Sequence, residues 1–169
     1  MSEIDNFNRI QEYRNRLDQA SDFNDVWEIV KDSVKNVSGL YRVGMMLFLD
    51  DLPLYLGAYH PVGTNNIILN RTLLEIVQEV KDSDANAFLY TLLLHEYIHA
   101  LGYLRESEVR SLVFEISKES FGTDHIVTRL ASSGPWSIIK DLQLYQVQGP
   151  KRDLEVVKNF DVKSQNYIA

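Results

Sequence analysis

The stretch from Ala85 to Leu101 constrains the fold more than any other part of the chain. It reads ANAFLYTLLLHEYIHAL and is apolar almost all the way round when it is plotted as a helix. A helix of this kind belongs in the interior of a domain rather than on its surface. Its only acidic or basic side chains are His95, Glu96 and His99. Because a buried charged group needs a partner or a metal ion, these three side chains require an explanation.

The three side chains form the pattern H-E-x-x-H, and its spacing suits a metal ion. Residues four apart lie on one face of a helix, so the imidazoles of His95 and His99 can close on one tetrahedral zinc ion. Glu96 is rotated away from that face and can reach a water molecule on the metal. The chain has no cysteine, so any transition metal must be held by His, Asp or Glu. A pair of ordinary core or surface histidines is the structural alternative.

The motif resembles that of the zincins, the superfamily of H-E-x-x-H zinc metallopeptidases. His-Glu-Tyr-Ile-His-Ala-Leu-Gly-Tyr-Leu-Arg follows the metzincin layout H-E-x-x-H-x-x-G-x-x-H up to its last position, where Arg105 replaces the third histidine. All three methionines precede the motif, so no Met-turn can lie beneath the metal. The resemblance covers the motif helix and the turn after it, and it indicates no subfamily. It implies a zincin-like fold, a Zn2+ cofactor and Glu96 as the general base.

The third metal ligand stays open between two carboxylates that follow Gly102. Glu106 lies one residue beyond the metzincin ligand position and opens Glu-Ser-Glu-Val, which looks like the acidic ligand motif on the second helix of gluzincin-like proteins. We take Glu106 as the first choice and Glu108 as the runner-up. Ordinary acidity at a helix start, favoured by the helix dipole, is the alternative for both.

The remaining candidates lie further from the motif. Glu115, Glu119 and His125 are poorly placed if a straight helix starts at Ser107, because its far end would be roughly 15–20 Å from the metal. His125 becomes attractive only if that segment is bent or non-helical. His60 is predicted to be a surface residue. Tyr103 could donate a hydrogen bond to an oxyanion, although packing is the commoner role for an aromatic residue after a helix.

The resemblance implies a zinc-dependent peptidase that acts on a peptide or protein substrate. Zinc would lower the pKa of its bound water towards about 7, and Glu96 would take the proton and pass it to the leaving amine. A zincin-fold metal-binding regulatory or interaction protein without efficient proteolysis is the alternative, because a short chain leaves little room for a large specificity subdomain. A helical interaction protein with an accidental motif is a third class.

Around the motif, the sequence predicts one α+β domain over residues 1–169, with a small mixed sheet packed on the buried helix within a helical bundle. The segment from about residue 149 is a candidate extended tail. By resemblance, Ile67–Asn70 is the candidate for the zincin edge strand that pairs with substrate, and a plain core strand is the alternative. Strands are predicted at Val43–Leu49, Leu54–Tyr59, Ile67–Asn70 and, as a further candidate, Leu142–Val147. Helices are predicted with inward faces Phe7/Ile10/Tyr13/Leu17, Phe23/Val26/Trp27/Val30/Val34, Leu73/Leu74/Ile76/Val77/Val80 (capped by Asn70) and Val109/Leu112/Val113/Ile116, and a short one at Asp124–Ala131.

Charge and hydropathy limit the kinds of partner that we expect. The net charge is −7, and no cluster of lysine and arginine is apparent, so nucleic-acid binding is not expected. The start of the chain is polar and acidic, unlike a signal peptide, and the longest apolar stretch is too short to span a bilayer. We therefore expect a cytoplasmic protein without membrane segments.

Overall fold

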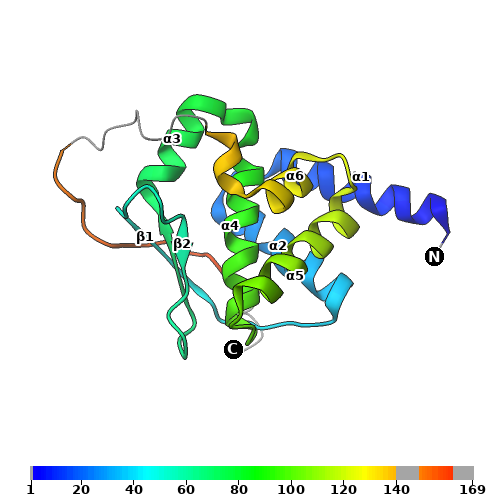
Figure 1. The fold of residues 1–169 in the computed structure, drawn as a ribbon, viewed down its shortest axis with the longest axis horizontal. Coiled ribbons are helices and arrows are strands. Elements are labelled where there is room, and N and C mark those ends of the chain that lie inside the picture. Colours follow the sequence, from blue (N-terminus) through cyan, green and yellow to red (C-terminus); the bar gives the residue numbers. More distant parts are fainter. Residues whose placement is uncertain (1, 140–148, 162–169) are drawn as a thin grey trace.

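The computed structural model describes residues 2–139 and 149–161, and these residues form an α+β fold (Figure 1). The long helices are α1 Glu3–Gln19, α2 Phe23–Ser38, α3 Arg71–Lys81, α4 Ala85–Ala100, α5 Glu106–Phe121 and α6 Ile126–Ser133. The short 3-10 helices are η1 Asp82–Asp84 and η2 Pro135–Ile138, and the strands are β1 Met46–Asp50, β2 Ala58–Tyr59, β3 Asn66–Asn70 and β4 Glu155–Val156. The predicted class, a small mixed sheet beside helices, is confirmed at this level.

The sheet has its strands in the order β2-β3-β1-β4. β1 and β3 are parallel, whereas β2 and β4 run antiparallel to their neighbours. Buried residues alternate with more exposed ones along β1, because successive side chains of a strand point to opposite faces. The buried residues Leu47 and Leu49 belong to the hydrophobic core, so one face of the sheet helps to enclose it.

Helix α4 lies between the sheet and most of the other helices (Figure 1). It contacts β2, β3 and every other α-helix of the described chain. Eleven of its 16 residues are buried, and Tyr97 packs edge-on against Trp27 of α2, with ring centroids 4.8 Å apart. The predicted interior position of this apolar helix is therefore confirmed. No helix in the described part of the chain is both long and apolar enough to cross a membrane.

Asn70 begins α3 as predicted, because its side-chain oxygen accepts a hydrogen bond from the backbone of Leu73 at 3.3 Å. The side-chain amide of Asn70 also donates to three backbone carbonyls between residues 52 and 56. These bonds hold the segment before β2 in a loop. The predicted strand Leu54–Tyr59 is therefore wrong over most of its length, and only its last two residues pair in the sheet.

The predicted strand Val43–Leu49 is wrong at its start. The strand begins only at Met46, because the backbone N–H groups of Gly44 and Met45 donate to the carboxylate of Asp161 at 3.0 and 3.1 Å. The buried carboxylate thus takes these donors out of the sheet ladder. The remainder of the strand lies inside the sheet, between β3 and β4.

Of the two interpretations of Ile67–Asn70, the edge strand implied by the resemblance is wrong and the plain core strand is confirmed. β3 lies between β1 and β2 and hydrogen-bonds to both, and its apolar residues are buried. A core strand of this kind has no free edge for a substrate. Among the residues that the structure describes, β2 lies at that edge of the sheet instead.

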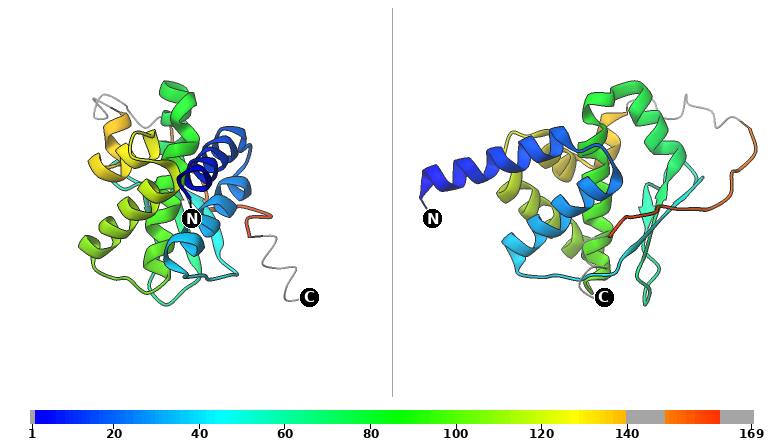
Figure 2. Two further views of the ribbon diagram at one scale, coloured as in Figure 1. Left: turned by 90° about the vertical axis from the view of Figure 1, so that its right-hand side faces the viewer. Right: turned by 180° about the vertical axis from the view of Figure 1, so that it is seen from behind.

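Helix α1 buries less of its apolar face than predicted. Tyr13 and Leu17 are buried and Ile10 is half-buried, but Phe7 is 61% exposed. The first half of α1 extends away from the other elements (Figures 1 and 2), so its side chains have little to pack against in the described structure. The periodicity of the sequence predicted the helix, but it could not predict how much of the helix other elements cover.

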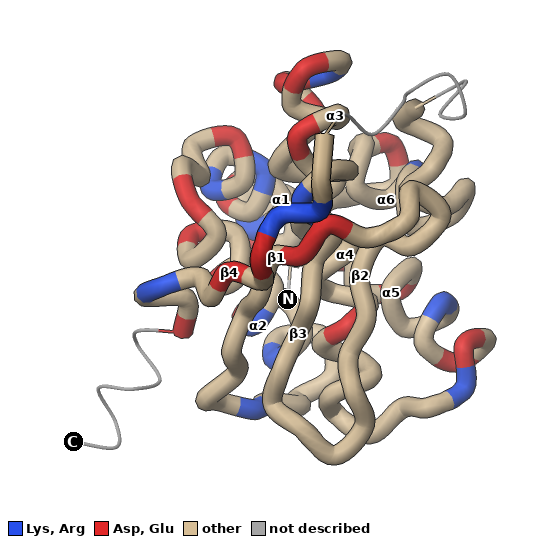
Figure 3. Tube along the Cα trace, turned by 90° about the vertical axis from the view of Figure 1, so that its left-hand side faces the viewer, with Lys and Arg blue, Asp and Glu red and all other residues tan. Residues whose placement is uncertain are grey.

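The C-terminal segment 149–161 is fastened to the sheet and to α2. Within it, β4 pairs with β1, and Arg152 binds Asp51 through its guanidinium at 2.8 and 3.0 Å. Acidic and basic positions adjoin where β1 ends (Figure 3). Arg152 and a further hydrogen bond from Arg71 lower the pKa of the Asp51 carboxyl well below its usual range. The predicted strand Leu142–Val147 lies outside the described residues.

The segment ends in a buried ion pair. The ammonium group of Lys31 lies 2.6 Å from Asp161 and 3.0 Å from Glu28, and the Lys31 and Asp161 side chains are 1% and 0% exposed. Asp161 also accepts the two backbone hydrogen bonds that delay the start of β1. One carboxylate therefore joins α2, the start of the sheet and the C-terminal segment.

We expect Asp161→Ala to lower the free energy of unfolding by about 3–5 kcal/mol, because it leaves a buried ammonium group without this partner. The double variant Lys31→Met/Asp161→Ala should recover part of that loss, since it removes the buried charge as well. Denaturant unfolding measures both, with Lys158→Met as an exposed control that should stay within about 0.5 kcal/mol of the parent protein. A cost below about 1 kcal/mol for Asp161→Ala would contradict the structural role of the pair.

Candidate functional site

The turn between α4 and α5 brings the two helices of the site together. After α4 the backbone N–H of Gly102 donates to the carbonyl of His99 at 3.0 Å, and Gly102 adopts a φ of +110°. Glycine takes such a backbone angle without the strain that a side chain would add. The chain can therefore reverse within a few residues, and α5 begins with Glu106 next to the last turn of α4.

The side chains of His95, His99 and Glu106 converge at this junction. Nε2 of His95 lies 3.1 Å from one carboxylate oxygen of Glu106, and Nε2 of His99 lies 2.8 Å from the other. One ligand atom from each residue lies within 4.8 Å of the other two, a group that could hold a metal ion. The two histidines are 28% and 15% exposed and Glu106 is 55% exposed, so an ion can reach the group from solvent.

The ring of His99 is held between two acceptors. Its Nδ1 lies 2.8 Å from the carbonyl oxygen of Tyr103, which can only accept, so Nδ1 carries the hydrogen. Its Nε2 faces a carboxylate oxygen of Glu106, a second acceptor. A cation, either a proton or a metal ion, is therefore required between Nε2 and the carboxylate. A hydrogen bond from the far ring nitrogen to a carbonyl is the usual way in which a metal-binding histidine is oriented.

Glu96 has different surroundings from Glu106. Its side chain is 6% exposed, and it makes no hydrogen bond with any residue that the structure describes. Burial raises the pKa of Glu96 to about 7, against an opposing effect of His99. For Glu106, burial alone would raise the pKa, but the neighbouring His95 and His99 outweigh it and lower the pKa. Burial lowers the pKa of the His95 imidazole, and Glu106 opposes that shift.

A cavity of about 440 Å³ adjoins this group of residues. His95 and Glu96 line it from α4, and Arg110 and Val113 line it from α5. Thr91 and Leu92 of α4 also line it. The rest of its wall comes from β2, α6, η2 and the residues next to them, namely Gly57, Ala58, Leu130, Ala131, Ser132, Ser133, Gly134, Pro135 and Trp136. Glu96 therefore opens into a space that a substrate group can enter.

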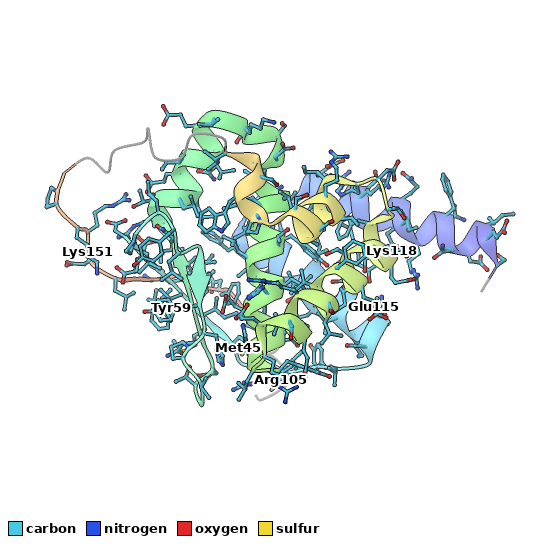
Figure 4. All side chains as sticks on the ribbon, viewed as in Figure 1. Met45, Tyr59, Arg105, Glu115, Lys118 and Lys151 are labelled. Carbon is cyan, nitrogen blue, oxygen red and sulfur yellow. The ribbon has the colours of Figure 1, made fainter. Side chains whose placement is uncertain are left out.

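The structure separates the other acidic and histidine candidates from this site. Glu108 lies 3.7 Å from Arg105 and is not part of the convergent group. Glu115 lies further along α5, away from the turn at Arg105 where the helix begins (Figure 4). His125 caps α6, where its Nδ1 accepts from the backbone of Val127 at 3.2 Å. Its role as a cap also explains why α6 begins two residues later than predicted.

Two further candidates have local structural roles. His60 lies in the loop between β2 and β3 and is half-buried, and its Nδ1 is 2.8 Å from the carbonyl of Asn66 at the start of β3. Tyr103 contributes its backbone carbonyl to the site through His99. Its side chain lines a separate shallow hollow with Ser107 and Leu112, so it does not face the cavity that Glu96 lines.

Sequence reasoning missed Arg110 and the α6–η2 wall of the cavity. A signal for Arg110 was present, because it follows Glu106 by four residues and so lies on the same face of α5. Trp136 had no such signal, since it follows the Gly134–Pro135 turn and reaches the cavity only through the tertiary arrangement.

The ring contacts predict opposite tautomers for two histidines. When both rings are neutral, His99 should carry its hydrogen on Nδ1, because it donates to Tyr103, and His125 should carry it on Nε2, because its Nδ1 accepts from Val127. Long-range ¹H–¹⁵N correlation spectra distinguish the two forms, and His125 serves as the internal control. An Nε2–H tautomer for neutral His99 would mean that the Tyr103 contact is not a hydrogen bond.

No protein-family model matches this chain, and no curated protein or solved structure matches it. What the site can do follows from the chemistry of its own side chains. These are two imidazoles and a carboxylate that face one another, with a buried carboxylate beside them in a cavity.

Proposed function

We propose that this chain is a zinc-dependent peptidase of the zincin type. In this proposal His95, His99 and Glu106 hold the metal ion, and Glu96 is the general base. One observation carries it: Nε2 of both histidines faces the Glu106 carboxylate, while Glu96, next in sequence to His95, opens into the adjoining cavity. Metal site and base therefore lie side by side, as hydrolysis requires.

The three side chains fit a zinc ion by their chemistry. Two imidazole nitrogens and one carboxylate oxygen are a common set for catalytic zinc, and three protein ligands leave a position open for substrate or water. Because Nδ1 of His99 donates its hydrogen to the Tyr103 carbonyl, the lone pair of Nε2 is available to bind a metal ion. A metal ion would also supply the positive charge that the contact between His99 and Glu106 requires.

The reaction would divide between the metal and Glu96. Zinc, when bound, would polarise the scissile carbonyl and lower the pKa of a water molecule. Glu96 would take a proton at its carboxylate and return it to the leaving amine. Its lack of a hydrogen-bond partner among the described residues supports this role, because no neighbouring donor competes for the oxygen that must accept the proton.

The position of the sheet supports the resemblance to zincins. β2 lies at an edge of the described sheet, and its residue Ala58 lines the same cavity as Glu96. An extended peptide that adds to this edge would run past the site, a form of β-augmentation. In this proposal β2 would take the role that the resemblance implied for Ile67–Asn70.

The proposal predicts about one equivalent of zinc per chain in protein purified without a histidine tag, with Glu106→Ala weakening zinc affinity by an order of magnitude or more. Competition with a chromophoric chelator measures the affinity. Glu108→Ala and Glu119→Ala remove the same charge from α5 outside the convergent group, so they should bind zinc like the parent. Stoichiometric zinc in His95→Ala/His99→Ala would rule out this site. Tighter binding of manganese or iron than of zinc by the parent would show that zinc is not the metal of the site.

Glu96→Gln should keep the fold and the zinc but lose nearly all peptidase turnover. Gln matches Glu in shape but cannot accept a proton, and general-base catalysis is worth roughly 10²–10⁴-fold. Metal content, thermal midpoint and cleavage of a mixed peptide library should be measured for both forms. Equal cleavage by the two would place the base elsewhere.

A result without cleavage would separate the two leading functions. If the parent and Glu96→Gln both bind zinc, and neither cleaves any peptide of the library, the chain is a metal-binding protein without efficient proteolysis. Binding of library peptides to the zinc-loaded parent would then identify its partners.

A further inference from the structure

Arg110 is a positive charge in the cavity that the proposed reaction does not use. It lies on α5 one turn after Glu106 and lines the cavity together with His95 and Glu96. It makes no hydrogen bond or ion pair with any residue that the structure describes. Glu106 would be its natural partner four residues away, but both oxygens of that carboxylate face the histidines instead.

The charge of Arg110 lies at the wall of the cavity that His95 and Glu96 also line. In a chain with a net charge of −7, this is a local positive group at the wall of a cavity. A guanidinium without a carboxylate partner is well suited to bind a planar anion through two parallel hydrogen bonds.

The remainder of the cavity is suited to an apolar side chain. Several of its lining residues are apolar, and they come from five different elements: Ala58, Leu92, Val113, Leu130 and Trp136. A volume of about 440 Å³ lies at the lower end of the range for small-ligand pockets. The cavity therefore has room for a group of residue size rather than for a long stretch of polypeptide.

We propose that the cavity binds the C-terminal residue of a peptide substrate, with its side chain against the apolar wall and its carboxylate on Arg110. This inference rests on the proposed peptidase function and names its substrate class. The peptide bond before that residue would then lie beside Glu96. One water molecule is consumed: its oxygen bonds to the carbonyl carbon, the C–N bond breaks, and the leaving amine gains a proton. The products are the shortened peptide, which carries the new carboxylate, and a free apolar amino acid.

The same guanidinium could instead meet the oxyanion that develops on the reacting carbonyl. Both are oxygen anions, but they differ in when they exist. A substrate carboxylate is present in the ground state, so its loss should change binding and KM. An oxyanion exists only during the reaction, so its loss should change kcat alone.

The test compares N-acetyl-leucine with N-acetyl-leucinamide, two probes that differ only in the carboxylate. Binding to metal-free protein is followed by NMR through the indole N–H of Trp136 and the Nε–H of Arg110, because zinc could hold the acid by itself. The parent should bind the acid at least about tenfold more tightly than the amide, the effect of one charge-assisted hydrogen bond. Arg110→Gln should lose this preference, and Arg110→Lys should keep part of it.

The control is Lys118→Gln, which removes the same charge from an exposed position further along α5 (Figure 4). It should keep the full preference for the acid. Equal binding of acid and amide by the parent, or a preference that survives in Arg110→Gln, would overturn the proposal. So would cleavage of C-terminally amidated peptides with a loss in Arg110→Gln of kcat but not KM, which would assign Arg110 to the oxyanion. Because the binding measurement needs neither zinc nor turnover, a failure of the peptidase function is seen separately.

Discussion

Burial of most of α4 among the sheet and the other helices is the constraint on which the rest of the structure depends. Most of the helix touches other elements, so its interior turns can carry only apolar or hydrogen-bonded side chains. The charged groups of the motif are tolerated because they lie in its last two turns, where the helix reaches a cavity and the solvent. The reversal at Gly102 then returns the chain along the same end of α4. A second helix thereby brings a carboxylate to two imidazoles that would otherwise lack one.

The two glutamates of the site have pKa values that their surroundings shift in opposite directions. Glu96 is enclosed by the body of the protein and has no hydrogen-bond donor among the described residues, so its charged form is disfavoured. Glu106 is more exposed and faces both histidines, so its charged form is favoured. Environments that push the pKa values of two carboxyl groups apart are typical of sites in which the groups have different tasks. This difference arises from one residue being inside α4 and the other at the start of α5.

The sequence predicted best those features that depend on residues close together in the chain. The apolar character of α4, the cap of α3 by Asn70 and the position of Glu106 just after Gly102 are of this kind, because helix periodicity and turn geometry act over a few residues. Strand order could not be predicted in the same way. β3 became an interior strand through its pairing with β2 and β1, and the start of β1 was fixed by Asp161, over a hundred residues away. The cavity was missed for the same reason, since its walls come from separate elements.

The contacts of Asp161 have a consequence for synthesis on the ribosome. Domains form during translation as their parts emerge, and contacts between distant parts of a chain can form only when both are present. Lys31 and the donors at Gly44 and Met45 leave the ribosome more than a hundred residues before Asp161 does. Helices α4 and α5 can pack earlier, whereas the hydrogen bonds of Gly44 and Met45 with Asp161 can form only after Asp161 has been added. The nascent chain should therefore pass through a stage in which the site has formed while one end of the sheet is still open.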